Sequence, residues 1–230
     1  DRVLAALQRP DGPTIVSLVP TTLARLLDAG LQHPPVLRWA LLGGAPLPPA
    51  LLQRAADAGV PVAPTYGLTE ACSQVATGGV PLFCTRVELE DDGEIVVSGP
   101  TVSPDAGPKL HTGDLGAFDA DGRLSIVGRK ADTIVTGGEN VAPAEVEAAL
   151  EAHPDVAEAG VVARPDDTWG EAVVALVRLR DGAQATPLDL LDHARAHLAR
   201  FKVPKDIQIV ADPLPRTASG KLVRRELSAL

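Results

Sequence analysis

The stretch TIVSLVPTTLARLLDAG, residues 14–30, decides the fold class of this 230-residue chain. Its first six residues, Thr14–Val19, are mostly apolar or β-branched, which is typical of a buried strand. Thr21–Gly30 then places apolar residues at helical spacing between a threonine cap and a glycine stop. The pattern repeats as a strand over 37–44, a helix with proline in its first turn over 48–59 and a strand over 60–67. This alternation predicts an α/β fold over residues 1–79, with a parallel sheet flanked by helices.

Residues 80–130 change to a pattern of alternating strands. RVELEDDGEIVVSGP, residues 86–100, and GAFDADGRLSIVG, residues 116–128, each place an Asp-Gly turn between two alternating apolar segments. Such a turn is the strongest short-range signal for a β-hairpin. We therefore expect this section to be antiparallel and barrel-like, and to end the first domain at residue 130.

Residues 131–230 predict a small α+β domain of their own. The pattern changes at GRKAD, Gly128–Asp132, and we place the domain boundary between residues 130 and 131. We expect strands over 132–136, 156–163, 171–179 and 207–210, and helices over 143–152, 187–199 and from about 222. The chain thus combines an α/β part, an antiparallel β part and a separate α+β domain.

The composition excludes several functional classes. A formal net charge of −9 argues against nucleic acid or an anionic membrane as a partner. Cys72 and Cys84 give neither a disulfide framework nor a zinc spacing, and no apolar run approaches the ~18 residues of a membrane span. The chain has no methionine and begins at Asp1, so we expect a trimmed or truncated product with a part missing upstream. We expect a cytoplasmic protein that binds neither nucleic acid nor membrane.

Polar residues gather at turns, in five stretches: YGLTE (66–70), HTGD (111–114), GRKAD (128–132), TGGEN (136–140) and PRTASGK (215–221). The last stretch ends at Lys221, one of five lysines beside sixteen arginines, and a lysine can place a compact charge on a phosphate or carboxylate. It is no nucleotide P-loop, because Pro215 takes the place of the first glycine and Leu222 follows the lysine. GGAPL (43–47) and the YGLTE stretch follow predicted strands, at the sheet edge where α/β folds bind ligands.

Together and in this order, the five stretches resemble the motifs of the adenylate-forming enzymes: acyl- and aryl-CoA synthetases, beetle luciferases and peptide-synthetase adenylation domains. The resemblance covers the whole chain. It implies an incomplete adenylate-forming fold, in which residues 1–130 are the second half of the large domain and residues 131–230 are a mobile lid. Within the family, YGLTEACSQVATG (66–78) and GGENVAPAEVEAAL (137–150) are most similar to the o-succinylbenzoate–CoA ligases of menaquinone synthesis.

The family makes an acyl-adenylate from a carboxylic acid and ATP and then transfers the acyl group to a thiol. The resemblance therefore implies ATP or AMP, Mg²⁺ and coenzyme A as cofactors and a small carboxylic acid as the substrate. It assigns the frame of the adenine to Gly43, Gly44, Ala45, Pro46, Tyr66 and Gly67. Asp114 would accept hydrogen bonds from the ribose hydroxyls, and Arg129 would donate to the ribose or phosphate.

The resemblance also assigns the residues nearest the chemistry. Thr69 would hydrogen-bond a phosphate and Glu70 would hold Mg²⁺, for which one carboxylate plus phosphate oxygens suffices. Lys221 would bridge the attacking carboxylate and the α-phosphate and neutralise charge as the bond forms. Ser73 and Gln74 would line the acyl pocket, where polar donors suit a substrate with a second carboxylate.

The lid carries two further assignments. Gly137 and Gly138 would line the passage for the pantetheine arm of coenzyme A, because a narrow tunnel needs backbone without Cβ atoms. Ala131 would be the hinge, at a position where relatives often have Asp, Lys or Ser.

Each assignment has a structural alternative. Thr69 also suits the cap of a helix, and Glu70 also suits an acid in the first turn that faces the helix dipole. Asp114 suits a turn, Arg129 an inter-domain salt bridge, and Tyr66 a core position. Ser73 and Gln74 fit an ordinary helix turn, and Gly137–Gly138 a glycine turn that needs no ligand.

The chain departs from the family pattern in one respect that affects function. It contains no Gly/Ser/Thr-rich loop for the outer phosphates of ATP, and it lacks the upstream part of the acyl pocket. We expect this chain alone to be inactive or weak, with the missing portion supplied by its parent chain or by another chain. The rival functions are a fatty- or aryl-acid–CoA ligase and a non-catalytic AMP-binding remnant.

Overall fold

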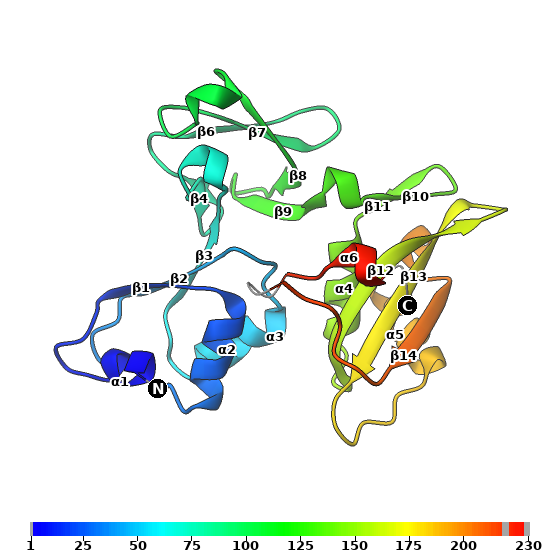
Figure 1. The fold of residues 1–230 in the computed structure, drawn as a ribbon, viewed down its shortest axis with the longest axis horizontal. Helices are drawn as coiled ribbons and strands as arrows, with labels where there is room; N and C mark the ends of the chain where they lie inside the picture. The colour runs from blue at the N-terminus through cyan, green and yellow to red at the C-terminus, as the bar shows by residue number, and fades with distance from the viewer. Residues whose placement is uncertain (1, 218–220, 228–230) are drawn as a thin grey trace. The chain divides into compact units, whose positions relative to one another are not determined.

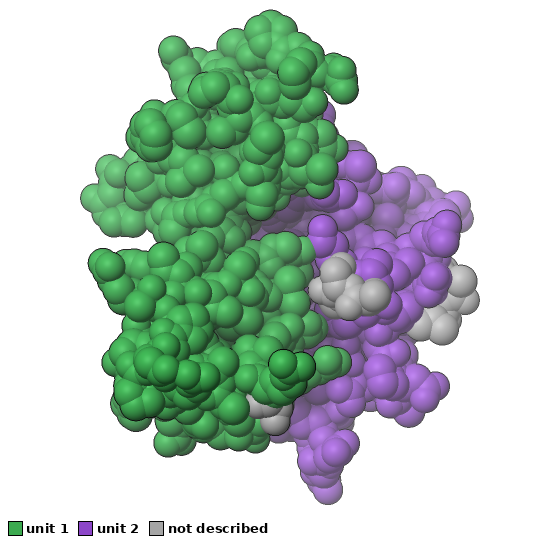
Figure 2. Space-filling model, turned by 60° about the vertical axis from the view of Figure 1, so that its left-hand side comes forward, with its two compact units in different colours: residues 1–126 green, residues 127–230 purple. Residues whose placement is uncertain are grey.

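The protein is described by a computed structural model that covers residues 2–217 and 221–227. Its contacts divide into two compact units, residues 1–126 and residues 127–230, which are coloured separately in Figure 2. Our division between residues 130 and 131 stays a prediction. Within the described ranges, no helix combines the length and apolar character that crossing a bilayer requires.

Unit 1 begins with the predicted α/β arrangement (Figure 1). The strands β1, β2 and β3 are parallel, and the short strands β4 and β5 continue the same sheet in antiparallel fashion. The elements are α1 (Arg2–Leu7), β1 (Ile15–Leu18), α2 (Pro20–Asp28), β2 (Trp39–Leu42), α3 (Pro49–Asp57), β3 (Val62–Tyr66), β4 (Ala76–Thr77) and β5 (Val80–Pro81). Buried leucines of α1, α2, α3 and β2 form the core of this part.

Two details of this part differ from the sequence-based expectation. Helix α2 begins at Pro20 and its N-cap is Val19 without a side-chain hydrogen bond, so the predicted threonine cap is wrong. Proline is favoured at the first helical position because its missing N–H would be unpaired there anyway. The glycine stop is confirmed: Gly30 has a φ of 93°, and its N–H donates to the carbonyl of Leu27.

The second sheet of unit 1 is the predicted antiparallel section. Its strands pair in the order β6 (Arg86–Leu89), β7 (Glu94–Ser98), β8 (Leu110–Phe118) and β9 (Leu124–Arg129). The two Asp-Gly turns join β6 to β7 and β8 to β9, as expected. The barrel-like character of this section stays a prediction. Strand β8 begins earlier than predicted and contains the whole HTGD stretch.

Unit 2 has the predicted α+β composition. Strand β13 is its centre: β12 pairs with one edge, while β10 and β14 pair with different parts of the other edge. The elements are β10 (Ile134–Thr136), β11 (Glu139–Val141), α4 (Pro143–Glu151), β12 (Val156–Asp166), β13 (Gly170–Leu179), α5 (Pro187–His197), β14 (Asp206–Val210) and α6 (Arg224–Leu227). A single 3-10 turn, Lys130–Asp132, takes the place of the first residues of the strand expected over 132–136.

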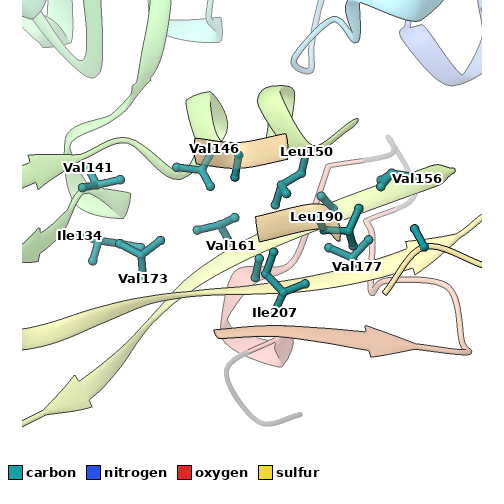
Figure 3. Close-up of a cluster of buried hydrophobic side chains, with 14 residues drawn as sticks. Ile134, Val141, Val146, Leu150, Val156, Val161, Val173, Val177, Leu190 and Ile207 are labelled. Atoms are coloured by element: carbon teal, nitrogen blue, oxygen red, sulfur yellow. The ribbon is translucent and has the colours of Figure 1, made fainter. Parts of the chain in front are cut away.

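Strand β13 is buried on both of its faces. Val173, Ala175 and Val177 point to a cluster that α4 and α5 cover with Val146, Leu150 and Leu190 (Figure 3). The alternate residues Ala172, Val174 and Leu176 point to a second cluster. That cluster is completed by Leu214 and Leu227, which come from the last part of the described chain. A strand covered on both sides explains the uninterrupted apolar run AVVALV at residues 172–177.

Replacing Leu190 by alanine tests the first of these clusters. Leu190 is fully buried, so Leu190→Ala should lower the stability of unit 2 by about 2–5 kcal/mol through lost contacts and the cavity left behind. Leu188 lies on the same helix but is 61% exposed, and Leu188→Ala should change stability by less than about 0.5 kcal/mol. Native-state hydrogen exchange of the β12 and β13 amides would measure both variants. Equal effects would contradict the assigned packing.

Candidate active site

The stretch after β3 forms a tight reversal of the chain. Thr69–Ala71 is a 3-10 turn, and the two residues after it, Cys72 and Ser73, have φ angles of 52° and 84°. Residues other than glycine rarely adopt this left-handed conformation, and it persists only where the surroundings impose it. The N-cap of this turn is Leu68, so the alternative of a cap at Thr69 is wrong, whereas Glu70 does lie in the first turn. The left-handed Ser73 also contradicts the alternative of an ordinary helix turn. Two consecutive strained residues are typical of a functional loop.

Gly67 makes this reversal possible. A Cβ atom on Gly67 would collide with the carbonyl of Ser73 and lie 2.8 Å from the Cα of Gln74. Only glycine therefore allows the chain to return across its own path here. The N–H of Val75 donates to the carbonyl of Tyr66 at 2.8 Å and closes the reversal.

Asp114 lies on a bulge of β8. The pairing of β7 with β8 shifts between Glu94 and Val96, which leaves Thr112–Asp114 outside the regular ladder, with Gly113 at a φ of 69°. The bulge is fixed locally: the Thr112 hydroxyl donates to the carbonyl of Ile95 at 2.8 Å, and the N–H of Gly113 donates to Glu94 Oε1 at 3.0 Å. Asp114 is 9% exposed. Asp114 lies within β8, so the alternative of a turn residue before the strand is wrong.

The hydroxyl of Tyr66 donates to Asp114 Oδ2 at 2.9 Å. The tyrosine is half-buried and packs against the cluster of Ala71, Val75 and Ile95. The structure thus joins two predicted nucleotide-binding residues that are 48 positions apart in the sequence. A buried carboxylate held in this way keeps acceptor capacity for a further donor.

The glycines after β2 bring two strands together. A Cβ on Gly43 would clash with the hydroxyl of Thr65 and lie 2.9 Å from the carbonyl of that residue, and Gly44 has a φ of 84°. Ala45 is half-buried and Pro46 is exposed. The GGAPL stretch therefore lies beside the carboxyl end of β3, as the sheet topology predicts. Its contact with adenine stays a prediction.

The carboxylate of Glu70 is the candidate ligand for Mg²⁺. Glu70 is exposed on the 3-10 turn, and its backbone carbonyl accepts from the N–H of Ser103 at 2.7 Å, which fixes its position. In the ranges 2–217 and 221–227, no group of three or more His, Cys, Asp or Glu residues could hold a metal ion. A single exposed carboxylate fits a magnesium ion that arrives with the phosphates of a nucleotide.

The residues proposed for the acyl pocket differ in their contacts. Ser73 is exposed, whereas the side-chain amide of Gln74 is half-buried and donates to the hydroxyl of Thr77. This hydrogen bond orients the side chain of Gln74, whose other polar atom is the amide oxygen. Ser73 belongs to the strained turn and Gln74 directly follows it, so the turn fixes the backbone of both residues.

In unit 2, Gly137 and Gly138 form the turn between β10 and β11. Their φ angles are 58° and 85°, which is typical of a two-residue hairpin turn. A Cβ on Gly137 would lie 2.7 Å from the ring of Trp169, and Lys205 Nζ lies 4.3 Å from the centroid of a Trp169 ring. The turn therefore lies against the Trp169 ring, and the ammonium group of Lys205 lies over the face of that ring.

The residues around the predicted hinge are accessible. Ala131 is the middle residue of the 3-10 turn Lys130–Asp132 and is exposed, and Arg129 is exposed at the end of β9. Asp132 accepts from Arg224 Nε at 3.1 Å, a contact that the sequence did not predict. The roles of Arg129 and Ala131 stay predictions.

Lys221 is exposed at the end of a closed loop. The N–H of Thr217 donates to the carbonyl of Lys221 at 2.8 Å, and the N–H of Lys221 donates to the Thr217 hydroxyl at 3.1 Å. The N–H of Val223 donates to the carbonyl of Pro215 at 2.9 Å and closes the base of the loop. Ala218, Ser219 and Gly220 lie outside the described residues.

Buried carboxylates lie beneath this loop. Glu147 on α4 and Glu158 on β12 are 7% and 8% exposed, and both are paired with arginines. Glu151, one helical turn after Glu147, accepts from the N–H of Ala159 at 3.3 Å. Burial raises the pKa of the Glu151 carboxyl, the Ala159 N–H opposes this, and the negative charge of Glu147 adds to the increase.

Sequence reasoning missed the two groups of contacts that give the site its geometry. The Tyr66–Asp114 hydrogen bond joins residues from two sheets, and the arginine–glutamate pairs join residues 58 and 77 positions apart. Gly113 inside a strand pattern was an available signal for the bulge. For the ion pairs, no local sequence pattern exists.

Comparisons with known proteins agree with these motifs. Residues 1–105 match the family model described as AMP-binding enzyme, and residues 145–221 match that of the AMP-binding enzyme C-terminal domain. A 2-succinylbenzoate–CoA ligase from Geobacillus sp. (strain WCH70) is 41% identical over 252 residues, which cover 94% of this chain and 51% of that relative. The chain therefore spans about half the length of the curated relatives it matches.

Solved structures show the same relationship. The o-succinylbenzoate–CoA synthetase from Bacillus subtilis in complex with its acyl-adenylate intermediate is 37% identical and has a TM-score of 0.85, covering 98% of this chain and 53% of that one. The same enzyme in complex with ATP and a magnesium ion is 37% identical, also has a TM-score of 0.85, and covers 99% and 54%. The fold is therefore that of adenylate-forming enzymes, present in part, as predicted.

Replacing Glu151 by glutamine tests the electrostatics beneath the lysine loop. The raised pKa of Glu151 means that the folded state binds its proton more tightly than the unfolded state, so this group favours folding at low pH and opposes it above its folded pKa. Glu151→Gln should therefore raise the melting temperature at pH 7. The gain should shrink as the pH falls toward the ordinary value of 4.5. Thermal unfolding between pH 4 and pH 8 would measure it, with Glu139→Gln at an exposed position as the control. A gain that does not depend on pH would contradict the stated cause.

Proposed function

Since the chain belongs to the AMP-binding enzyme family, we propose that the whole protein is an ATP- and Mg²⁺-dependent acid–CoA ligase that acts through an acyl-adenylate. The acid that we propose is o-succinylbenzoate. This chain would carry the second half of the large domain and the lid. The remaining portion, which binds the outer phosphates of ATP, would come from the parent chain or from another chain.

The observation that carries the proposal is the buried carboxylate of Asp114, held by the hydroxyl of Tyr66 at 2.9 Å. A ribose offers two neighbouring hydroxyl donors, and an acid at a nucleoside site accepts from them. Because the tyrosine and the bulge of β8 fix Asp114, the carboxylate is oriented before the ligand arrives. The turn that carries Thr69 and Glu70 is fixed to the same part of the fold as Tyr66, because Ala71 belongs to the hydrophobic cluster against which Tyr66 packs.

Glu70 and Lys221 supply opposite charges for the adenylation step. Glu70 would hold Mg²⁺, and the ion, when bound, neutralises phosphate charge and withdraws electrons from the phosphorus. Lys221 would contact the substrate carboxylate and the α-phosphate, which are both anions and repel each other. A positive charge between them lowers the barrier because charge accumulates on the phosphate oxygens as the new bond forms.

The lid offers a face that suits coenzyme A. The Gly137–Gly138 turn has no Cβ atoms, Gly137 lies against the Trp169 ring, and the ammonium group of Lys205 lies over that ring. In the same unit, Arg195, Arg200 and Lys205 line a hollow of about 490 Å³ with Leu191 and Leu198. Coenzyme A carries several phosphates, so the cationic hollow supports binding of its nucleotide end, and the glycine turn supports passage of its thiol arm.

The choice of o-succinylbenzoate rests on the relatives and on two polar residues. The curated relative and the enzyme in the two solved structures reported above are both named after this acid. They are 41% and 37% identical to this chain. Ser73 and Gln74 offer polar atoms for a second carboxylate. A fatty- or aryl-acid–CoA ligase remains the alternative within enzymes, and a non-catalytic AMP-binding remnant is the alternative outside them.

The nucleotide site can be tested on the 230-residue chain itself. AMP should bind more tightly than ATP, because the chain contains candidate partners for adenine, ribose and α-phosphate but no Gly/Ser/Thr-rich loop for the outer phosphates. Asp114→Asn should weaken AMP binding about ten- to a hundredfold, the loss expected for charge-assisted hydrogen bonds worth about 1.5–3 kcal/mol. Titration calorimetry would measure both effects, with Asp91→Asn, an exposed acid on the β6–β7 turn, as the control. Tighter binding of ATP than of AMP, or an effect of Asp91→Asn equal to that of Asp114→Asn, would count against the site.

The role of Lys221 can be tested in the whole protein. Lys221→Ala should slow pyrophosphate exchange roughly 10²- to 10³-fold, by analogy with the loss of one transition-state donor. With synthetic acyl-adenylate and coenzyme A, the same variant should form thioester at a near-parental rate. Lys109→Ala, at a surface ion pair with Glu88, is the control. Gly138→Trp should have the opposite effect, keeping adenylation and losing thioester transfer. Equal loss of both steps in Lys221→Ala would show that the lysine is not dedicated to adenylation.

A further inference from the structure

The loop that carries Lys221 is held at its base by two arginines, one on each side. Arg216 lies five residues before Lys221, and Arg224 lies three residues after it. Each arginine reaches down to a different buried glutamate of unit 2, Arg216 to Glu158 and Arg224 to Glu147. The two glutamates belong to neighbouring elements, β12 and α4.

Arg224 makes the larger set of contacts. Its guanidinium forms a two-pronged pair with Glu147, with Nη1 donating to Oε1 and Nη2 to Oε2, the latter at 3.1 Å. Nη1 also donates to the carbonyl of Val161 at 3.0 Å, and Nε donates to Asp132 Oδ2 at 3.1 Å. Glu147 accepts in addition from the N–H of Val161 at 2.9 Å. One side chain thus connects α6 with α4, with β12 and with the turn Lys130–Asp132.

Arg216 is the counterpart before the lysine. Its Nε donates to Glu158 Oε2 at 3.2 Å, and the other oxygen of the same carboxylate accepts from Arg178 Nε at 2.6 Å. Arg216 also forms an isolated β-bridge with Leu222, the residue directly after Lys221. The carboxylate of Glu158 therefore fixes the strand-like start of the loop to the edge of β12.

We propose that Arg216, Arg224, Glu147 and Glu158 form a clamp whose purpose is to place Lys221 for adenylation. The proposal rests on the proposed function, and it makes the two arginines positioning residues, since they act through the lysine. Through Asp132, the clamp also ties the lysine loop to the turn that contains the predicted hinge residue Ala131. Through the contact of Asp132 with Arg224, a movement at that turn would also move the segment that carries Lys221.

Stability alone does not explain the choice of charged residues. Buried ion pairs are often no more stable than apolar residues of similar volume, and leucines at 214, 222 and 227 already anchor this segment to the sheet. The loop itself cannot be held by apolar packing, because Lys221 has to stay exposed to reach a ligand. Directional hydrogen bonds at Arg216 and Arg224, forked in the case of Arg224, restrict the two ends of the loop while leaving Lys221 exposed.

The test measures the two half-reactions of the whole protein separately. Arg224→Ala should slow pyrophosphate exchange about 10- to 100-fold, the scale expected when a catalytic group is misplaced by about 1 Å. Thioester formation from synthetic acyl-adenylate should stay within about twofold of the parent, which a general loss of structure would not allow. Arg224→Lys keeps the charge and much of the volume but loses the fork, and it should fold normally and give an intermediate loss of adenylation.

Two controls separate the clamp from general charge effects. Arg225→Ala removes an exposed charge from the residue next to Arg224, and Lys109→Ala removes a surface charge from unit 1. Both variants should adenylate at close to the parental rate. Hydrogen exchange of the amides of Thr217, Lys221 and Val223 should be faster in Arg224→Ala and Arg224→Lys than in either control.

The outcomes distinguish this inference from the proposed function. If the parent adenylates no acid, or if Lys221→Ala adenylates normally, the proposed function fails first. If Lys221→Ala loses adenylation but Arg224→Lys and Arg216→Ala retain it fully, the clamp does not position the lysine. Equal slowing of both half-reactions in Arg224→Lys, with native circular dichroism, would also overturn the inference. If Arg224→Ala does not fold, Arg224→Lys decides.

Discussion

Unit 2 depends on one constraint: its central strand, β13, has apolar side chains on both faces, and both faces need cover. Helices α4 and α5 cover the first face with the cluster that includes Val146, Leu150 and Leu190. The second face is covered by Leu214 and Leu227, which lie on either side of the lysine loop in the sequence. The last segment of the described chain must therefore cross this face of the sheet, and the crossing fixes where the loop begins and ends. Lys221, the residue proposed to act on the ligand, is thereby placed by the hydrophobic packing of its neighbours.

The same packing buries the carboxylates of Glu147 and Glu158, which the arginines of the clamp neutralise. Glu147 and Glu158 are almost completely buried, and a buried carboxylate is costly unless donors surround it. Their donors are the arginines that flank Lys221, together with the N–H of Val161 in the case of Glu147 and Arg178 in the case of Glu158. Glu151 shows what happens with fewer donors, because burial raises its pKa. Arg216 and Arg224 are thus complementary to the buried glutamates Glu158 and Glu147, and each charge explains why the other is present.

The elements with strong periodicity could be predicted from the sequence, and the contacts between distant residues could not. The apolar run of β13, the Asp-Gly hairpins and the helices after β1 and β2 are where their patterns indicate, because each pattern is local. The cap of α2 was misassigned because Pro20 fits the first helical position better than a threonine fits the cap. The left-handed turn at Cys72 and Ser73 could not be predicted, because neither residue is a glycine. The close approach at Gly67 and the surrounding packing impose this conformation. Tyr66–Asp114 and Arg224–Glu147 arise only when separate elements meet, so the motifs named the residues but not their partners.

The residues of the proposed chemistry are divided between two units, and each group is held within its own unit. Tyr66 orients Asp114 inside unit 1, where the bulge of β8 and the strained turn after β3 supply the rest of the geometry. In the proposed arrangement the clamp would orient Lys221 inside unit 2, and Trp169 lies against the Gly137 turn in the same unit. Neither group needs the other unit to acquire its shape. In the proposed function, unit 2 would be a lid that serves two half-reactions, and such a lid would require this property. If the lysine and the glycine turn are each rigid within it, a rotation at one exposed turn would exchange them without rebuilding either.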